Sequence, residues 1–274
     1  MPVISTNIAA NTALRYLNAN SAAQTESLSK ISSGQRIQSA SDDASGLAIG
    51  TTMAADVAVL NQAATNITQG QSVLNTADGA LSQVSDILER MKALTAQAQS
   101  GSLEDADRTY IDAEYQQLLE EIDSIVTTTN FNGKTLLDGA SDYAAGADFL
   151  VGATATETIT VTLDAANLTD LGIDGSDVTT AATAADAMTA LETAISTVSE
   201  MRANVGASMS RFEYRGNVVD SSLESLQEAE SSIMDVDLAS EQTNYTNAST
   251  MTQAAISALS QANSVQQQLL KLLQ

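Results

Sequence analysis

Apolar side chains spaced three or four residues apart predict one long helix in the first half of the chain. From residue 53 to residue 98 this spacing continues almost without interruption, and only two members of the series are polar. The spacing places a narrow apolar seam along one face of a helix, which is typical of a coiled coil. At about 1.5 Å per residue, the helix is roughly 70 Å long. The seam comprises Met53, Val57, Leu60, Ala64, Ile67, Gln71, Leu74, Ala77, Leu81, Val84, Leu88, Met91, Thr95 and Ala98.

A second seam of similar length lies near the other end of the chain. Its steps of three and four residues alternate without a slip, and three of its members are not apolar. If the two helices pack antiparallel, residues 1–44 and 238–274 emerge at the same end, and we expect them to be neighbours. The second seam comprises Met188, Leu191, Ile195, Val198, Arg202, Val205, Met209, Phe212, Gly216, Val219, Leu223, Leu226, Glu230 and Ile233.

The two ends of the chain show weaker amphipathic patterns. Residues 4–33 predict a helix that ends at Gly34, and residues 240–273 predict another helix with the series Tyr245, Ala248, Thr252, Ala255, Leu259, Ala262, Gln266, Leu269 and Leu273. Helices with so little apolar surface are marginal alone in water, so each needs a partner. The candidate self-assembly residues are Ile4, Ile8, Leu14, Leu17, Leu28, Ile31, Leu259, Leu269, Leu270 and Leu273.

The middle of the chain contains a shorter helix and a β segment. Ser102 and Asp105 predict a capping pair for a helix over residues 103–128. That helix is expected to bury Ile111, Tyr115, Leu118, Ile122 and Ile125.

Asn132-Gly133 predicts a turn after this helix, and residues 158–163 alternate as a half-buried strand does. Together the patterns predict a mostly α protein: a long antiparallel helical coiled coil or bundle built from both chain ends, with a small tip that contains a β-hairpin.

Residues 35–44 form a short, polar and irregular segment, which predicts a hinge. Asp42 and Asp43 stand where the long helix begins, and their carboxylates are expected to stabilise its N-terminus through the helix dipole.

Charge is concentrated in the middle of the sequence. The chain carries 34 acidic and 11 basic side chains, for a net charge of −23. The first 40 residues hold one acid and three bases, and residues 238–274 hold one of each, which leaves 32 acids and seven bases between them. Uncharged amphipathic ends on an acidic body indicate that something outside the monomer buries the ends. So strong a negative charge argues against a nucleic acid or an anionic membrane as partner.

The sequence lacks the side chains on which the common catalytic sites depend. Histidine and cysteine are absent, which excludes Ser-His-Asp and Cys-His sites and the usual zinc ligands. The segment Gly133–Thr135 resembles the end of a phosphate-binding loop. That motif requires a glycine five residues before Gly133, and this position holds Thr128, so the match fails. Asp170, Asp174 and Asp177 do not follow the calcium-loop pattern and are expected to be solvated turn residues. We therefore expect no enzyme activity, no cofactor and no metal.

Several segments, in collinear order over about residues 1–140 and 185–274, resemble the bacterial flagellins. Those near the start match the family's N-terminal signature, one matches its turn after the second helix, and those near the end match its C-terminal signatures. The matching segments are Thr6–Asn7, Ser32–Ile37, Ser41–Ile49, Phe131–Gly133, Leu136–Gly139, Arg202–Ala207 and Asp235–Glu241.

The resemblance implies a structural subunit that polymerises with many copies of itself into the flagellar filament for swimming motility. It implies export without a secretory signal through the flagellar type III apparatus, an extracellular location, and a flagellar cap, junction proteins and an export chaperone as partners. A hook–filament junction protein of the same family is the alternative. The implied domains are an inner core (1–34 and 241–274), a connecting spoke (35–44 and 235–240), an outer helical tube (45–140 and 185–234) and a short variable surface insert (141–184).

The resemblance also implies a receptor contact. Flagellins are recognised by Toll-like receptor 5 through an arginine, a leucine and a glutamate on the two outer helices. Arg90, Leu94 and Glu114 occupy the corresponding positions in this sequence. Met91 and Ala93 depart from the strongly recognised pattern, in which a valine and a glutamate are common.

Overall fold

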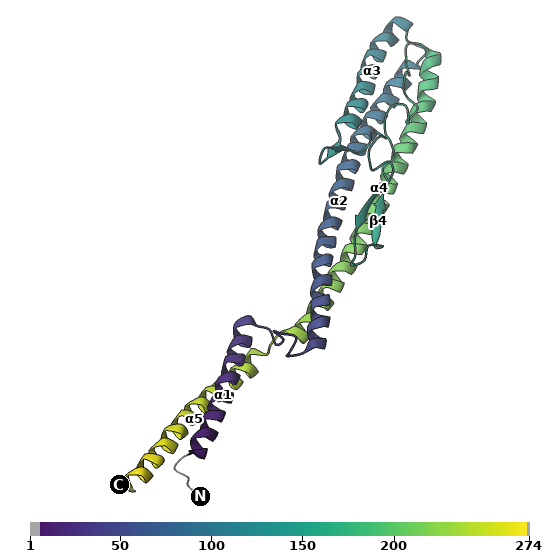
Figure 1. Cartoon of the computed structure of the whole chain (residues 1–274). Coiled ribbons are helices and arrows are strands. Elements are labelled where there is room, and N and C mark those ends of the chain that lie inside the picture. Colours follow the sequence, from purple (N-terminus) through teal and green to yellow (C-terminus); the bar gives the residue numbers. More distant parts are fainter. Residues whose placement is uncertain (1–5, 273–274) are drawn as a thin grey trace. The chain divides into compact units, whose positions relative to one another are not determined.

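The computed structural model of the chain (Figure 1) describes residues 6–272, and the side chains of residues 6–268. Within these residues there are five helices: α1 (Ile8–Ser33), α2 (Ala44–Ala98), α3 (Asp105–Thr128), α4 (Ala181–Met234) and α5 (Leu238–Leu272). Four short strands lie between α3 and α4: β1 (Asn130–Phe131), β2 (Lys134–Thr135), β3 (Ala147–Leu150) and β4 (Thr158–Val161). The prediction of a mostly α protein built on long helices from both ends is confirmed.

The chain forms two compact units. The first comprises Met1–Ala55 with Ser225–Gln274, and the second comprises Asp56–Glu224. The first unit therefore includes the early turns of α2 and the last turns of α4 as well as α1 and α5. The finer division into core, spoke, tube and insert stays a prediction.

In the first unit α1 and α5 lie side by side and antiparallel (Figure 1). The side-chain amide of Asn7 donates to the Ala262 carbonyl at 3.1 Å, and that of Gln24 lies 3.5 Å from the Tyr245 hydroxyl. A residue later in α1 therefore contacts a residue earlier in α5, as antiparallel packing requires. The prediction that the two ends of the chain are neighbours is confirmed.

The second unit is built on the two predicted seams. Every seam position from Leu60 to Ala98 in α2, and from Met188 to Leu223 in α4, is partly or fully buried. The helices approach closely at Gly70, where an added Cβ would lie 2.7 Å from the ring of Phe212. Phe212 itself has no exposed surface. The antiparallel pairing is further marked by an ion pair between Arg202 and Asp78 at 3.0 Å.

The start of α3 differs from the prediction because a later residue caps it. Glu104 is the N-cap, and its backbone N–H donates to the Asp107 carboxylate at 3.3 Å. Ser102 is within hydrogen-bond distance of the Ser100 hydroxyl instead, at 2.8 Å, so the predicted Ser102–Asp105 capping pair is wrong. Farther along α3, Leu119 and Val126 are buried where the prediction named Leu118 and Ile125, which are only partly buried.

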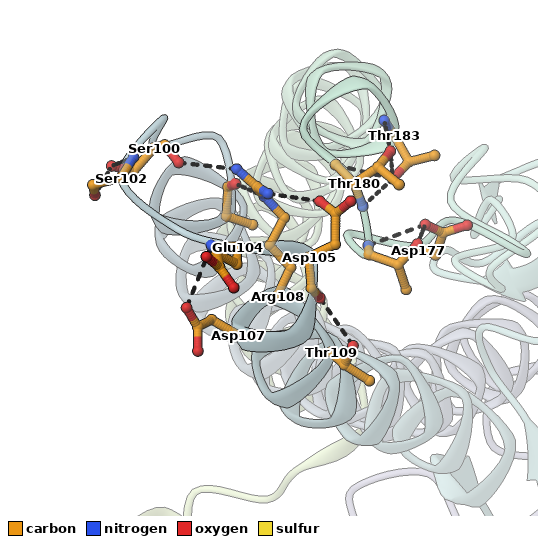
Figure 2. A network of polar contacts seen from close by, with 12 residues as sticks. Ser100, Ser102, Glu104, Asp105, Asp107, Arg108, Thr109, Asp177, Thr180 and Thr183 are labelled. Carbon is orange, nitrogen blue, oxygen red and sulfur yellow. Dashed lines mark hydrogen bonds and ion pairs between the residues drawn. The ribbon is translucent and has the colours of Figure 1, made fainter.

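Arg108, which the sequence analysis did not select, holds the turn between α2 and α3 (Figure 2). Its guanidinium donates to the Ala98 carbonyl at 2.7 Å and to the Ser100 carbonyl at 3.0 Å, and it pairs with Asp105 at 2.7 Å. These bonds satisfy carbonyls that the end of α2 leaves without helical partners. Arg108 is 6% exposed, so its charge is buried with its partners already in place.

The strands form two antiparallel hairpins. Asn132 and Gly133 join β1 and β2 with φ angles of 52° and 77°, as a two-residue type I′ turn requires, so the predicted turn is confirmed. In β4 the exposed and buried residues alternate, which confirms the half-buried strand, and β4 pairs with β3 in the register Ala147 to Val161.

The β3–β4 hairpin lies against the sides of the long helices. The ring of Phe149 meets that of Phe212 edge-on at 5.7 Å, and Asn66 donates to the Leu150 carbonyl at 3.0 Å. Arg215 donates to the Val151 carbonyl at 2.9 Å. The hairpin is present as predicted, but it packs midway along α2 and α4 and not at a tip (Figure 1).

We predict that Phe212→Ala lowers the free energy of unfolding by about 3–5 kcal/mol, because it empties the contact between α2, α4 and β3. The matched control is Tyr214→Ala, two residues away in the same helix and 74% exposed. This control should change the free energy by no more than about 0.5 kcal/mol. Urea unfolding followed by circular dichroism measures both. Equal effects of the two substitutions would contradict this account of the core.

Candidate assembly surface

Small and polar side chains form most of the contact between α1 and α5. The α1 residues that face α5 are partly or fully buried at steps of three and four: Asn7, Ala10, Ala13, Leu17, Asn20, Gln24, Ser27 and Ile31. The predicted series in α5 is partly or fully buried from Tyr245 to Gln266. Among the described side chains of both helices, only Ser27 and Ala255 fall below a tenth exposed. A seam this small buries little apolar area, so it stabilises the pair weakly.

Large apolar side chains instead point away from this seam. Eight of the large apolar residues that are exposed in the described chain lie on α1 and α5: Ile8, Leu14, Tyr16, Leu28, Leu238, Met251, Ile256 and Val265. Their exposed fractions range from 44% for Leu14 to 67% for Ile8. Exposed apolar surface of this extent, on a pair that is itself poorly packed, marks an interaction surface. We call these eight residues the apolar surface of α1 and α5.

The structure places the predicted self-assembly residues in three groups. Ile8, Leu14 and Leu28 belong to the exposed apolar surface. Leu17, Ile31 and Leu259 are partly buried in the seam. Ile4 and Leu273 lie outside the described residues, and Leu269 and Leu270 lie in α5 outside the described side chains.

The α1 stripe proposed from the sequence therefore combined two faces of one helix. The residues that it missed are Tyr16, Leu238, Met251, Ile256 and Val265. The four on α5 are not members of the series, spaced by three and four residues, that predicted the seam. Large apolar residues outside that series are the sequence signal that could have identified them.

A short backbone ladder fixes the chain where it enters and leaves the helix pair. Gln35 and Asp235 form an antiparallel bridge, in which the Arg36 N–H donates to the Met234 carbonyl at 2.6 Å and the Val236 N–H donates to the Gly34 carbonyl at 3.0 Å. The Arg36 guanidinium also donates to the Ile233 carbonyl at 2.6 Å. The polar sequence of residues 35–44 predicted an irregular hinge, and the ladder is a regular feature within it.

Glycine and aspartate fix the two helix ends beside this ladder. Gly34 ends α1 with a φ of 75°, a conformation that favours glycine. The Asp43 carboxylate accepts from the N–H groups of Ser45 and Gly46 at 3.0 and 2.9 Å and so caps α2. Asp42, which also precedes α2, bonds to the loop before it instead. It accepts from the N–H groups of the loop residues Gln38 and Ser39, and these bonds lower its pKa.

A polar cluster sits where α1 and α5 approach the ladder. The nearly buried hydroxyl of Ser27 donates to the Glu241 carboxylate, and this bond holds the pKa of Glu241 below its ordinary value of 4.5. The Lys30 ammonium donates to Glu26 at 2.7 Å, and this bond raises the pKa of Lys30. Each hydrogen bond favours the charged form of its side chain, within α1 for Lys30 and between α1 and α5 for Glu241.

The described residues show neither a metal cluster nor a membrane-crossing helix. No group of three or more carboxylate, histidine or cysteine side chains in residues 6–268 could hold a metal ion. No helix among the described residues is both long and apolar enough to cross a bilayer.

Of the three residues proposed for receptor contact, two form an exposed ion pair. The Arg90 guanidinium on α2 donates to the Glu114 carboxylate on α3 at 2.6 and 3.0 Å, and both side chains are about half exposed. Leu94 is 3% exposed because it packs into the core of the second unit. Leu94 is thus buried in the monomer, and its contact with a receptor stays a prediction.

Both ends of the chain match bacterial flagellins. The bacterial flagellin N-terminal helical region matches residues 4–142, and the bacterial flagellin C-terminal helical region matches residues 188–273. These two regions contain all five helices except the first turns of α4. They leave the β3–β4 hairpin outside the match.

Relatives match over nearly their full length. A flagellin of Bacillus subtilis is 38% identical over 98% of this chain and 99% of the relative. A flagellin of Halalkalibacterium halodurans is 37% identical over 99% of each chain. The flagellar filament 30.7 kDa core protein of Treponema maltophilum is 35% identical over 99% of each chain.

Two solved structures are similar in fold. The crystal structure of Bacillus cereus flagellin has a TM-score of 0.51 and 31% identity, and covers 56% of this chain and 88% of that one. A putative flagellar hook-associated protein from Vibrio parahaemolyticus has a TM-score of 0.58 and covers 71% of this chain and 100% of that one. Its identity is 17%, so it supports the fold alone.

We predict that acid weakens the pairing of α1 and α5 through Glu241. Its contribution to stability is present above the unfolded pKa, near 4.5, and is lost as the pH falls through the lower folded pKa. Between about pH 6 and pH 3, Glu241→Gln should remove about 1 kcal/mol or less of the pH dependence. Thermal melting followed by circular dichroism measures the change. Glu228→Gln, at an exposed glutamate of the same unit, is the control, and an equal effect there would exclude a specific role for Glu241.

Proposed function

We propose that this chain, which belongs to the bacterial flagellins, enters the flagellar filament by burying the apolar surface of α1 and α5 against neighbouring copies. It is a structural subunit that polymerises with copies of itself into that filament. Flagellin is a filament protein and not an enzyme. The function as a filament subunit, expected from the sequence resemblance, is confirmed.

One observation carries the proposed mode of assembly. The long helices of the second unit bury most of their large apolar side chains within the monomer, whereas α1 and α5 leave most of theirs exposed and bury mainly Ala, Ser, Asn and Gln between them. The two terminal helices are thus stabilised far less by their own contact than the helices of the second unit are. Burial by further copies supplies the missing apolar contact.

Contacts between copies through the apolar surface of α1 and α5 can repeat along a filament and need not form a closed oligomer. The surface lies on two antiparallel helices whose exposed residues differ, and we propose that a copy that packs on it uses a different patch of its own. A contact between unlike patches that does not close on itself generates an open helical polymer. The hook–filament junction protein is not favoured, because the full-length relatives reported above are filament flagellins.

The remaining partners and the location belong to this proposal. We propose export through the flagellar type III apparatus to an extracellular filament, with a flagellar cap, junction proteins and an export chaperone as partners. Membership of the flagellin family supports this. A weakly stabilised helix pair at the chain ends suits a subunit that is exported unfolded, because little free energy opposes its unfolding.

Arg90 and Glu114 support a narrower receptor proposal. The pair is exposed on two adjacent helices of the second unit, so a receptor can reach both side chains without disturbing the core. Arginine is common among residues that dominate binding energy in interfaces. We propose that Toll-like receptor 5 binds this pair, with Leu94 supporting the site from within the core.

We predict that seeded assembly requires α5 and its exposed apolar residues. A chain that ends at Ser240 should give no filaments, because it lacks almost all of α5. Ile256→Glu should also fail, because a charge at this exposed position opposes burial without disturbing the seam. Ile256→Val keeps the apolar character and should assemble. Pelleting and negative-stain electron microscopy measure the outcome.

Circular dichroism of each monomer confirms that its helices are intact before assembly. Filaments from the chain that ends at Ser240, or from Ile256→Glu at the rate of the parent, would overturn the proposed role of the apolar surface. Only short rings from the parent chain would favour the junction protein.

We predict that Arg90→Ala abolishes receptor signalling by the monomer, because it removes the exposed guanidinium. Lys92→Ala is the matched control, since Lys92 forms a similar exposed ion pair with Glu192 at 3.1 Å. A reporter cell line for Toll-like receptor 5 measures signalling. Equal losses in both variants, or a parent monomer that never signals, would reject the site.

A further inference from the structure

Met251 differs from the other methionines that the structure describes. It is 59% exposed on α5, whereas Met91 has no exposed surface and Met201 is 7% exposed. The remaining described methionines are partly buried. The sequence contains no cysteine. Met251 is therefore the most exposed methionine in residues 6–268.

Met251 also occupies a specific place on the apolar surface. It lines a groove between α1 and α5 together with Tyr16, which is 58% exposed, and with Ala13, Ala254, Ala255 and Ala258. Among its seven lining residues, only the Asn20 amide and the Tyr16 hydroxyl carry polar side-chain groups. A polar group introduced at residue 251 therefore finds few hydrogen-bond partners once a neighbouring copy covers the groove.

We propose that Met251 is an oxidation site through which peroxides control polymerisation, an inference that rests on the proposed burial of the apolar surface. The thioether sulfur attacks one oxygen of hydrogen peroxide. A sulfur–oxygen bond forms and the oxygen–oxygen bond breaks. The departing hydroxide takes the proton of the transferred oxygen and leaves as water. The sulfur loses two electrons and becomes a sulfoxide, and the peroxide gains them.

The sulfoxide changes the surface because it converts a flexible apolar side chain into a polar one. Burying a polar group that lacks a hydrogen-bond partner opposes association. Oxidised monomer should therefore have a critical concentration for assembly about tenfold higher than untreated monomer. In assembled filaments the neighbouring copy covers Met251, so the same peroxide should oxidise it far more slowly.

The test treats the full-length monomer with a limited amount of hydrogen peroxide and locates the sulfoxide by peptide mass spectrometry. Seeded assembly then gives the critical concentration. We expect Met251 to be oxidised before Met91 and Met201, assembly to weaken about tenfold, and treatment with a methionine sulfoxide reductase to restore it. Met251→Leu, which retains apolar bulk without sulfur, should assemble and should resist peroxide.

The outcomes separate this proposal from the assembly proposal. If untreated parent chain and untreated Met251→Leu both fail to assemble, the burial of the apolar surface is wrong, and the oxidation proposal falls with it. If untreated chains assemble but Met251 sulfoxide does not weaken assembly, only the oxidation proposal is overturned. Equal loss of assembly in peroxide-treated Met251→Leu would also overturn it, because the relevant oxidation would then be elsewhere. Equal oxidation rates of Met251 in monomer and filament would overturn its burial by a neighbouring copy.

Discussion

Burial of one continuous apolar seam between α2 and α4 is the constraint on which the second unit depends. Neither helix could persist over more than 50 residues in water on helical propensity alone. Large side chains fill much of the seam, and Gly70 leaves room for the Phe212 ring, because an added Cβ there would lie 2.7 Å from it. The third helix and the β3–β4 hairpin pack on this pair and extend its core through Tyr115 and Phe149.

The terminal helices α1 and α5 also pair through residues spaced by three and four, but their seam is weaker and contains polar side chains. Their shared seam contains Asn7 and Gln24, whose side chains bond across to α5. A polar residue in a coiled-coil seam fixes register and orientation at a cost in stability. The pair is therefore aligned without being strongly held. Its large apolar residues stay exposed, and they are the residues through which we propose that copies of the chain pack in the filament.

Charge has a lesser role in the fold. Six of the seven basic side chains between residues 41 and 237 form ion pairs: Arg90, Lys92, Arg108, Lys134, Arg202 and Arg215. Most of these pairs are well exposed, so each stabilises the fold little. Arg108 is the exception, because its buried guanidinium completes the hydrogen bonding at the end of α2. The large excess of acid keeps the outer surface solvated.

The sequence by itself determined the two long seams, the antiparallel return of the chain, the Asn132-Gly133 turn and membership of the flagellins. These features rest on strong contrasts between large apolar and polar positions, or on turn residues with restricted backbone angles. In α5 the seam was also predictable, because its small and apolar residues keep a strict three-four series.

Only the tertiary structure decided which face of α1 meets α5, that Glu104 caps α3, that Leu94 is buried, and where the β3–β4 hairpin packs. In α1 the facing residues other than Leu17 and Ile31 are Ala, Asn, Gln and Ser, which resemble a solvated face, so hydrophobicity gives little contrast there. The other three depend on contacts between segments distant in the sequence or on a choice between adjacent caps. Local pattern carries no information about such contacts, because the free energy that selects them arises only when the segments meet.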